Sequence, residues 1–340
     1  MSLIIAYLGI LTVLVIALNA RFLGEALGVM DDPEQEKHKR HTISTPLIGS
    51  LLVGSIAVTI VINQMVFELS DRWGGVSTCV LLVAALGFLD DRHNLKWQLR
   101  LALIVAICGL LVWLVPEIRL TSLHWSFGET TVLSRWVGAL LTVACLATLV
   151  VSFNMMDGYN GGVIGISLIL VLVMALLSVS PHRQAICLFL ASALGIMFFY
   201  NMKGKFFLGD GGAYALGLLV GSLALMTYNL GSATVPVYAD TVGIWLMLPA
   251  VDCLRVTLGR KLRKQSPFSA NRDHLHHILL DRFDAGTTLA IIMSIVGATV
   301  SLSLFTASYS FILFVACFCL YFFILPIIDS TFPAKAENPL

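Results

Sequence analysis

The sequence predicts an all-α integral membrane protein, a polytopic bundle of about eleven transmembrane helices. Of its 340 residues, 58% are hydrophobic and only 12% are charged, about half the charged fraction of an ordinary soluble domain. The mean hydropathy is +0.90. No alternating pattern suggests a barrel, and lipid cannot hydrogen-bond to an exposed backbone, so the spans are expected to be helices.

Eleven apolar runs are long enough to cross a bilayer. They fall near residues 2–20, 46–66, 74–89, 99–115, 132–153, 161–180, 185–200, 213–228, 240–256, 288–307 and 309–328. The first run ends in a weak resemblance to a signal-peptidase site, but no positive residue precedes it and it has the length of a full span. We therefore expect a retained helix. No long linker interrupts the runs, so residues 1–340 are expected to form a single domain.

The basic residues predict the orientation of the bundle. One set of loops comprises residues 21–45, 90–98, 154–161, 201–212 and 257–287, together with the C-terminus. Counted with the helix-end residues Arg100 and Arg255, this set holds 17 of the 21 Lys and Arg residues. The positive-inside rule places it in the cytoplasm. With eleven spans, the N-terminus is then periplasmic and the C-terminus cytoplasmic.

The same five loops concentrate acids, amides and histidines. The residues concerned are Asp31, Asp32, Lys39, Arg40, His41, Asp90, Asp91, Asn154, Asp157, Asn160, Asp210, Arg272, His274, His276 and His277. The loops on the other side carry only scattered charges. Ionisable groups at the edge of a bilayer are costly and tend to be functional. The pattern therefore predicts one polar site at the cytoplasmic membrane surface.

Each polar motif taken alone has a simpler interpretation. Asp90 and Asp91 fit a solvated helix end, residues 154–158 fit an ordinary turn, and Asp210 fits a helix N-cap. The histidines at 274, 276 and 277 fit polar loop residues or a zinc site. The seven cysteines all lie in apolar runs without a CxxC pair, so they are expected to be small buried hydrophobes. The combination of motifs on one side favours a functional site.

The ligand types favour a magnesium-bound diphosphate. Carboxylates and an amide are hard oxygen ligands, which suit Mg²⁺ or Mn²⁺ better than zinc. The glycine-rich segment around Asp210 opens a helix and offers backbone N–H groups to an anion. Arg272 and the three histidines add donors. Gly204-Lys205 lacks both the first glycine and the following Ser or Thr of a P-loop, and no HExxH is present.

Five segments in order resemble a known family. They are DDPEQEKHKRHTISTPLIG, GFLDDR, FNMMDGYNGG, FFLGDGG and SPFSANRDHLHHILL, which spread from residue 31 to residue 280. They are similar to the polyprenyl-phosphate N-acetylhexosamine-1-phosphate transferases of the glycosyltransferase 4 family, and most similar to the bacterial branch that acts on undecaprenyl phosphate. The resemblance also implies ten or eleven helices.

The resemblance implies roles for individual residues. One of Asp90 and Asp91 acts on the lipid phosphate, and because neighbouring helix positions point about 100° apart, the two are not expected to share one role. Asp157 is an acid near the nucleotide. Asp210 binds the metal, and Asn154 can join it. Asn160 stands where the bacterial pattern usually has a second Asp. The expected substrate-binding residues are Lys39, His41, Asn160, Arg272, His274, His276 and His277.

The expected reaction moves N-acetylhexosamine-1-phosphate, most plausibly GlcNAc-1-phosphate, from a UDP-sugar to undecaprenyl phosphate. It would depend on Mg²⁺, with Mn²⁺ able to substitute, and would release UMP at the start of a cell-envelope glycan such as O-antigen lipopolysaccharide. The expected location is the bacterial inner membrane, where the protein would contact membrane lipid. Assembly as a homodimer stays open, and no nucleic-acid partner is expected.

Three alternatives stay open at this stage. The donor could be another UDP-N-acetyl sugar, and the chemistry could proceed in two steps through an aspartyl-phosphate. A secondary transporter would need acids near the midplane in a repeated pattern, which the sequence does not show. Asp252 lies three residues before Arg255, on one helical face, which fits either a structural ion pair or a direct role in the site.

Overall fold

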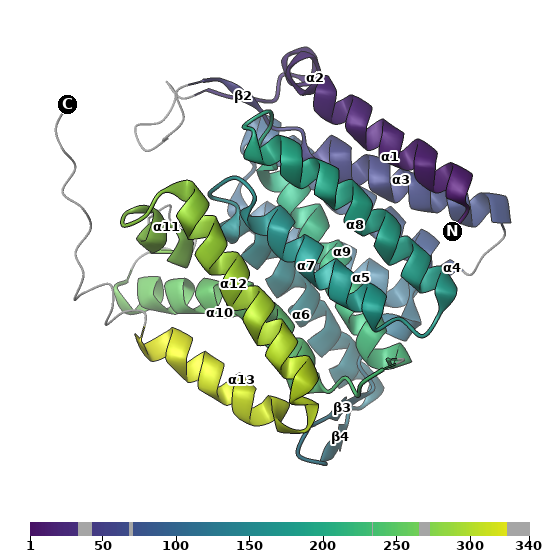
Figure 1. The fold of residues 1–340 in the computed structure, drawn as a ribbon, viewed down its shortest axis with the longest axis vertical. Coiled ribbons are helices and arrows are strands. Elements are labelled where there is room, and N and C mark those ends of the chain that lie inside the picture. The colour runs from purple at the N-terminus through teal and green to yellow at the C-terminus, as the bar shows by residue number, and fades with distance from the viewer. Residues whose placement is uncertain (33–42, 68–70, 233, 265–272, 325–340) are drawn as a thin grey trace.

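Helices make up most of the chain in the computed structural model, which describes residues 1–32, 43–67, 71–232, 234–264 and 273–324 (Figure 1). The α-helices are α1 Leu3–Leu18, α2 Ala20–Leu27, α3 Gly49–Phe67, α4 Asp71–His93, α5 Trp97–Leu114, α6 Arg135–Met156, α7 Gly162–Leu176, α8 Pro181–Met202, α9 Gly209–Leu230, α10 Ala239–Leu262, α11 Leu275–Leu280, α12 Ala285–Phe305 and α13 Ser310–Cys319. Short 3-10 turns cover Pro116–Ile118 (η2) and Ala307–Tyr309 (η3), and a π-helical turn, η4, covers Leu320–Ile324.

The predicted helical membrane architecture is confirmed. Within the described residues, each of the eleven apolar runs overlaps a helix, and eight helices are long and apolar enough to span a bilayer. The pair α1 and α2 passes the same test together but is bent by 72°, while α7 and the segment 307–322 are shorter. The chain is therefore a multi-pass membrane protein, and the count of eleven spans stays a prediction.

Helix α9 lies at the centre of the bundle and packs against α3, α4, α6 and α7. Its small residues explain this position, because they let neighbouring backbones approach closely where lipid offers no hydrophobic drive between helices. A Cβ atom on Gly217, for example, would lie 2.8 Å from the Cα atom of Val150 in α6. The start of α9, which carries Asp210, is held by three neighbouring helices, α3, α4 and α6.

The closest approach on α9 involves Gly87 of α4. A Cβ atom on Gly87 would overlap the backbone of Gly211. We expect Gly87→Ala to lower the free energy of unfolding by about 1–3 kcal/mol, because neither backbone can yield without moving a helix. Melting temperature in detergent measures the effect. Gly109→Ala in α5 is the matched control, since a Cβ there meets no atom within 4 Å; equal melting temperatures for the two variants would contradict the packing.

Two short hairpins mark opposite ends of the molecule (Figure 1). At one end, strand β1 (Met30–Asp31) pairs antiparallel with β2 (Thr45–Pro46), and Leu47 bridges to Phe207 just before α9. At the other, β3 (Ser122–His124) pairs antiparallel with β4 (Thr130–Val132). The β1–β2 end therefore brings the described parts of the first predicted polar loop alongside the start of α9.

Candidate active site

The start of α9 is the anchor of the polar site. Asp91, near the end of α4, accepts hydrogen bonds from the backbone N–H groups of Asp210 at 2.8 Å and Gly211 at 3.1 Å. Gly209 has φ +67°, and a Cβ atom there would lie 2.8 Å from the Asp91 carboxylate. Position 209 therefore requires glycine, both because its φ is positive and because a side chain would collide with Asp91. Asn154, near the end of α6, donates its Nδ2 to Asp210 Oδ1 at 2.6 Å.

Asp90 and Asp91 have different partners, as their helical spacing requires. Asp90 accepts from Arg100 Nη1 at 2.5 Å and from the backbone N–H of Leu95 at 2.8 Å, and its side chain is only 1% exposed. The same Arg100 nitrogen lies 3.3 Å from Asp210 Oδ2. Arg100 therefore bridges two carboxylates, one buried and one, on Asp210, that is 31% exposed.

A cavity of about 270 Å³ lies beside this cluster. One wall is polar and comes from α5, α6, α9, α10 and α11. Its polar side chains are Arg100, Asn154, Asp157, Tyr214, Arg260, His274, His276 and His277. Arg100 and Asn154 connect this wall to Asp210, which lies behind them. Three of the five predicted polar loops thus meet at one cavity through side chains placed by different helices.

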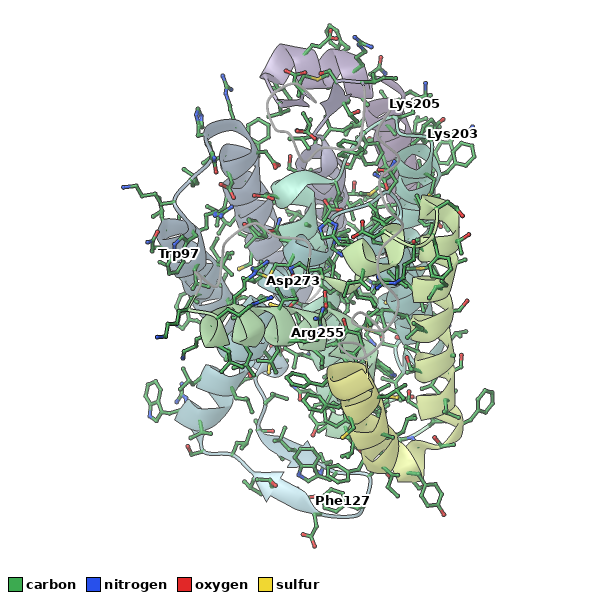
Figure 2. The ribbon with its side chains drawn as sticks, turned by 90° about the vertical axis from the view of Figure 1, so that its left-hand side faces the viewer. Trp97, Phe127, Lys203, Lys205, Arg255 and Asp273 are labelled. Carbon is green, nitrogen blue, oxygen red and sulfur yellow. The ribbon has the colours of Figure 1, made fainter. Side chains whose placement is uncertain are left out.

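The rest of the cavity lining is apolar. Its side chains are those of Trp97, Leu101, Ile104, Val151 and Met155, from α5 and α6. Helix α5 is the least buried of the eight long helices, with 17% of its apolar window inside the protein. Trp97 itself is 37% exposed at the edge of the molecule (Figure 2). Part of the apolar lining therefore belongs to a helix whose apolar window lies mostly on the outside of the protein.

Not every predicted residue reaches the cavity. Asp90, Asp91 and Asp210 lie behind its lining, and Asn160 lies in the turn before α7 and is not among the lining residues. Lys39, His41 and Arg272 fall outside the described residues. Their roles therefore stay predictions from the sequence.

Asp157 is the acid that lines the cavity directly. It caps the C-terminus of α6 and lies outside that span. Burial, reinforced by the nearby charge of Asp91, raises the pKa of Asp157 to about 8. A carboxyl group with a pKa near neutrality can exchange a proton at physiological pH.

The acidic cluster also fits a hard cation. The carboxyl groups of Asp90 and Asp210 both contact Arg100, Asp91 binds the backbone of Asp210, and the charge of Asp91 acts on Asp157. Across the described residues, no three His, Cys, Asp or Glu side chains form a preassembled metal site. Oxygen donors in this number suit Mg²⁺, which takes one or two carboxylates and completes its shell with water and substrate phosphates.

His276 is a buried ring without hydrogen-bond partners among the described residues. It is 1% exposed, and both ring nitrogens lack a partner. The ring stacks on Tyr159 at 5.6 Å and lies 4.1 Å from the ring of His277, while a Cβ on Gly158 would overlap it. Burial, with the neighbouring charge of His277, holds the pKa of His276 well below its ordinary value. The neutral ring offers one donor and one acceptor to a ligand.

The neutral state of His276 predicts a pH-dependent stability. Because the unfolded chain protonates this ring below about pH 6.5 while the folded chain does not, the free energy of unfolding should fall as pH decreases from 7.5 toward 5. The slope from this residue is at most about 1.4 kcal/mol per pH unit. Melting curves of the wild type and of His276→Asn test this, with the exposed His93→Asn as control. An unchanged pH slope in His276→Asn would refute the assignment.

His274 is held rather than free. Its Nδ1 lies 2.8 Å from Oδ2 of Asp252, whose side chain is fully buried in α10. Asp252 also pairs with Arg255 at 2.9 Å, so the ion pair considered from the sequence is present. Arg255 and Asp273 lie close together near the middle of the view in Figure 2. Asp252 is not among the residues that line the cavity.

Sequence reasoning missed Arg100, Arg260, Tyr214 and Trp97. Both arginines entered the prediction only as charges that orient the bundle. Arg100 lies within the apolar run 99–115, where a cation is itself a signal of a buried partner, whereas Arg260 lies in a basic loop segment that gives no such signal. Arg260 is 3% exposed and lines the cavity. Tyr214 and Trp97 carried no signal, because aromatic residues are common in membrane helices and at their ends.

Comparison with known proteins finds a family whose model covers part of this region of the chain. Residues 73–228, from α4 to α9, match the sequence profile of glycosyl transferase family 4. Relatives named undecaprenyl-phosphate alpha-N-acetylglucosaminyl 1-phosphate transferase include one from Yersinia pestis, 25% identical over 272 residues (77% of this chain and 72% of the relative). Another, from Escherichia coli strain K12, is 24% identical over 320 residues (89% and 85%).

A more distant organism gives a similar match. A Bacillus subtilis protein named probable undecaprenyl-phosphate N-acetylglucosaminyl 1-phosphate transferase is 25% identical over 284 residues, which cover 80% of this chain and 75% of the relative. The segment matched by the family contains Asp90, Asp91, Asn154, Asp157 and Asp210. The similarity to these relatives extends over most of the chain, and the part that contains the carboxylate cluster is similar to glycosyl transferase family 4.

Proposed function

We propose that the protein transfers N-acetylhexosamine-1-phosphate, with GlcNAc-1-phosphate as the preferred group, from a UDP-sugar to undecaprenyl phosphate and releases UMP. The observation that carries this proposal is the cavity lined by both polar and apolar side chains, next to clustered carboxylates in a membrane protein that is similar to this family. The diphosphate of a UDP-sugar needs polar groups, and the chain of a lipid phosphate needs apolar surface, so the two substrates require both kinds of lining in one cavity.

The polar wall supports binding of the donor. Arg260 and Arg100 bring guanidinium groups to the cavity, and guanidinium forks match phosphate oxygens. His274, His276 and His277 contribute ring nitrogens on the same wall. Arg272, Lys39 and His41 are proposed to add donors from the neighbouring loops, which follows from the sequence alone.

Asp210 and Asn154 are the residues proposed to hold Mg²⁺, with Mn²⁺ as a substitute. The carboxylate of Asp210 is 31% exposed, against 1% for Asp90, and the side-chain amide of Asn154 is hydrogen-bonded to it. The ion would neutralise the charge that builds up on the diphosphate. Asp91 keeps the backbone of Asp210 in place through the start of α9.

The transfer breaks one phosphoanhydride and forms another. An oxygen of the lipid phosphate bonds to the β-phosphorus of the donor, and the bond from that phosphorus to the bridging oxygen breaks, so UMP leaves with the electron pair. The geometry favours Asp157 as the group that takes or holds the lipid phosphate proton, because it lines the cavity and has a pKa of about 8. A direct role of Asp90 or Asp91 stays a prediction.

A single displacement is expected to invert the configuration at a chiral β-phosphorus. In this scheme the lipid phosphate attacks directly and no phosphorylated enzyme forms. Stereochemical analysis of the product from a donor with an isotopically chiral β-phosphate measures this. Retention, together with a trapped aspartyl-phosphate, would establish two displacements and contradict the direct route.

The acceptor is proposed to enter from the bilayer along the apolar wall of α5 and α6. We further propose eleven spans in one domain, the N-terminus in the periplasm, the C-terminus and the site on the cytoplasmic face of a bacterial inner membrane, and a role in starting an O-antigen or related glycan. Reporter fusions at the external loop 116–134 and the loop after Leu262 test the orientation. If the fusion at residues 116–134 reports a cytoplasmic location and the fusion after Leu262 a periplasmic one, the proposed orientation is reversed.

The substrate assignment is tested with a panel of UDP-sugars. Purified protein is incubated with undecaprenyl phosphate, Mg²⁺ and each sugar nucleotide, and UMP and lipid product are measured, with chelator in a parallel arm. We expect the highest kcat/KM for UDP-GlcNAc and no turnover with chelator. Preference for another UDP-N-acetyl sugar would change the assignment of the donor substrate. Turnover without divalent metal would contradict the proposed metal site.

A further inference from the structure

One buried carboxylate outside the cavity organises the histidine wall. Asp252 in α10 accepts four hydrogen bonds, from His274 Nδ1 at 2.8 Å, Leu275 N at 3.2 Å, Arg255 Nη2 at 2.9 Å and Tyr321 Oη at 2.7 Å. These donors come from α10, from the start of α11 and from the π-helical turn η4. The side chain is fully buried, so every accepting oxygen is satisfied within the protein.

The backbone is fixed on both sides of His274. Before it, the carbonyl of Asp273 accepts from Arg255 at 2.5 Å. After it, the N–H of Leu275 donates to Asp252. The ring between these two anchors lines the cavity, is 6% exposed, and stacks with the ring of His276 at 5.8 Å. Asp252 does not line the cavity, so it can influence a ligand only through what it holds.

The carboxylate also decides which nitrogen of His274 carries hydrogen. A carboxylate oxygen accepts and does not donate when ionised, so the nitrogen 2.8 Å away must be an N–H. Asp252 is paired with Arg255, which keeps it an anion despite full burial. Nδ1 is therefore the donor to Asp252, and Nε2 is the nitrogen left for a ligand.

From this arrangement we infer that Asp252 is a positioning residue, which acts through His274 to set the donor-substrate affinity of the site. It fixes the hydrogen on Nδ1, so that Nε2 is left to accept a hydrogen bond from an O–H or N–H group of the uridine nucleotide. The bond to Leu275 also holds α11, which carries His276 and His277 to the cavity wall. This inference rests on the proposed function and goes beyond it by assigning the buried ion pair a role in substrate affinity.

The same contacts argue against a purely stabilising role. A buried ion pair is often no more stabilising than well-packed apolar side chains of similar volume. Here the charged group instead selects the tautomer of a ring that lines the cavity, as a buried carboxylate does beside a catalytic histidine. Loss of that carboxylate should therefore lower the affinity for a uridine nucleotide in addition to its effect on folding.

The test is a double-mutant cycle between Asp252 and His274. Asp252→Asn keeps the side-chain shape but donates to Nδ1 and so reverses the ring tautomer. His274→Asn keeps an N–H for Asp252 but removes Nε2. Each variant should raise the Kd for UDP, and the KM for the UDP-sugar, by about 10-fold or more. The double variant should bind UDP no worse than His274→Asn alone.

Independent effects would overturn the inference. If the losses of the two single variants multiply in the double variant, Asp252 does not act through His274. Tyr321→Phe is the matched control, because it removes another donor from the same carboxylate without touching His274. It should leave the Kd for UDP close to the wild-type value, and a loss equal to that of Asp252→Asn would show a structural role only.

Two further readouts separate this inference from the proposed function. Melting temperatures of all variants are measured in parallel, and if Asp252→Asn fails to fold, His274→Asn still reports on Nε2, since it retains the partner of Asp252. Binding is measured by calorimetry of the purified full chain with UDP and Mg²⁺. A wild type that binds no uridine nucleotide refutes the proposed function. A wild type that binds UDP while both single variants bind it equally well refutes this inference alone.

Discussion

Replacing Asp210 with Asn is expected to abolish metal-dependent release of UMP while the protein still folds. The side chain keeps its size, and the backbone N–H of residue 210 still donates to Asp91, so the start of α9 is preserved. The anionic oxygen beside Asn154 is lost, and with it the ligand for a hard cation. We expect kcat to fall by at least about 100-fold, the range seen when one electrostatic group is removed from a reaction centre.

The Asp210→Asn experiment needs a binding readout besides activity. Mn²⁺ titration followed by electron paramagnetic resonance should show weakened metal binding in Asp210→Asn. Asp284→Asn is the matched control, because that exposed residue caps α12 through Thr287 and Asn is an equally good cap. Wild-type UMP release by Asp210→Asn would remove this residue from the metal site.

Replacing Arg100 with Met is expected to cost both stability and activity. Arg100 is the charged partner of Asp90, whose side chain is 1% exposed, so its loss leaves a buried carboxylate without its counter-charge. Breaking such a pair costs about 3–5 kcal/mol. The same nitrogen reaches Asp210, and the guanidinium lines the cavity, so we also expect at least about a 100-fold loss of kcat/KM.

A second substitution separates the two effects of Arg100. In Arg100→Met with Asp90→Asn the buried charge is removed together with its partner, so the melting temperature should recover while UMP release stays low. Arg72→Met is the control, since Arg72 and Glu117 form an exposed pair at 3.1 Å, worth about 1 kcal/mol or less. Recovery of activity along with stability in the double variant would show that Arg100 acts only on the fold.

The helices of this protein could be predicted from the sequence because a bilayer makes apolar length decisive. Each predicted run overlaps a helix among the described residues, although α6 continues to Met156, past the predicted end of its run at residue 153, and so includes Asn154. The 72° bend between α1 and α2 could not be predicted. Residues 20–27 form a short amphipathic helix, and a hydropathy average over a longer window does not separate it from the apolar helix before it.

Most of the residues near the site could be predicted from the sequence, because ionisable side chains at membrane depth are rare and are found where they have partners. The arrangement could not. Asp91 caps α9 only because Gly87 and Gly211 let α4 and α9 touch, a contact between residues far apart in the chain. The three histidines look alike in sequence, yet His274 is tied to a carboxylate and His276 is buried without a partner among the described residues.

The most direct test of the central claim is which nucleotide the enzyme releases. Purified protein with UDP-GlcNAc, undecaprenyl phosphate and Mg²⁺ is followed by chromatography of nucleotides and mass spectrometry of lipid. Transfer of a sugar phosphate predicts UMP and a lipid-diphosphate-sugar in equal amounts, and none of either with Asp210→Asn. Release of UDP with a lipid-monophosphate-sugar would mean that the sugar–oxygen bond is broken instead, and would contradict the account.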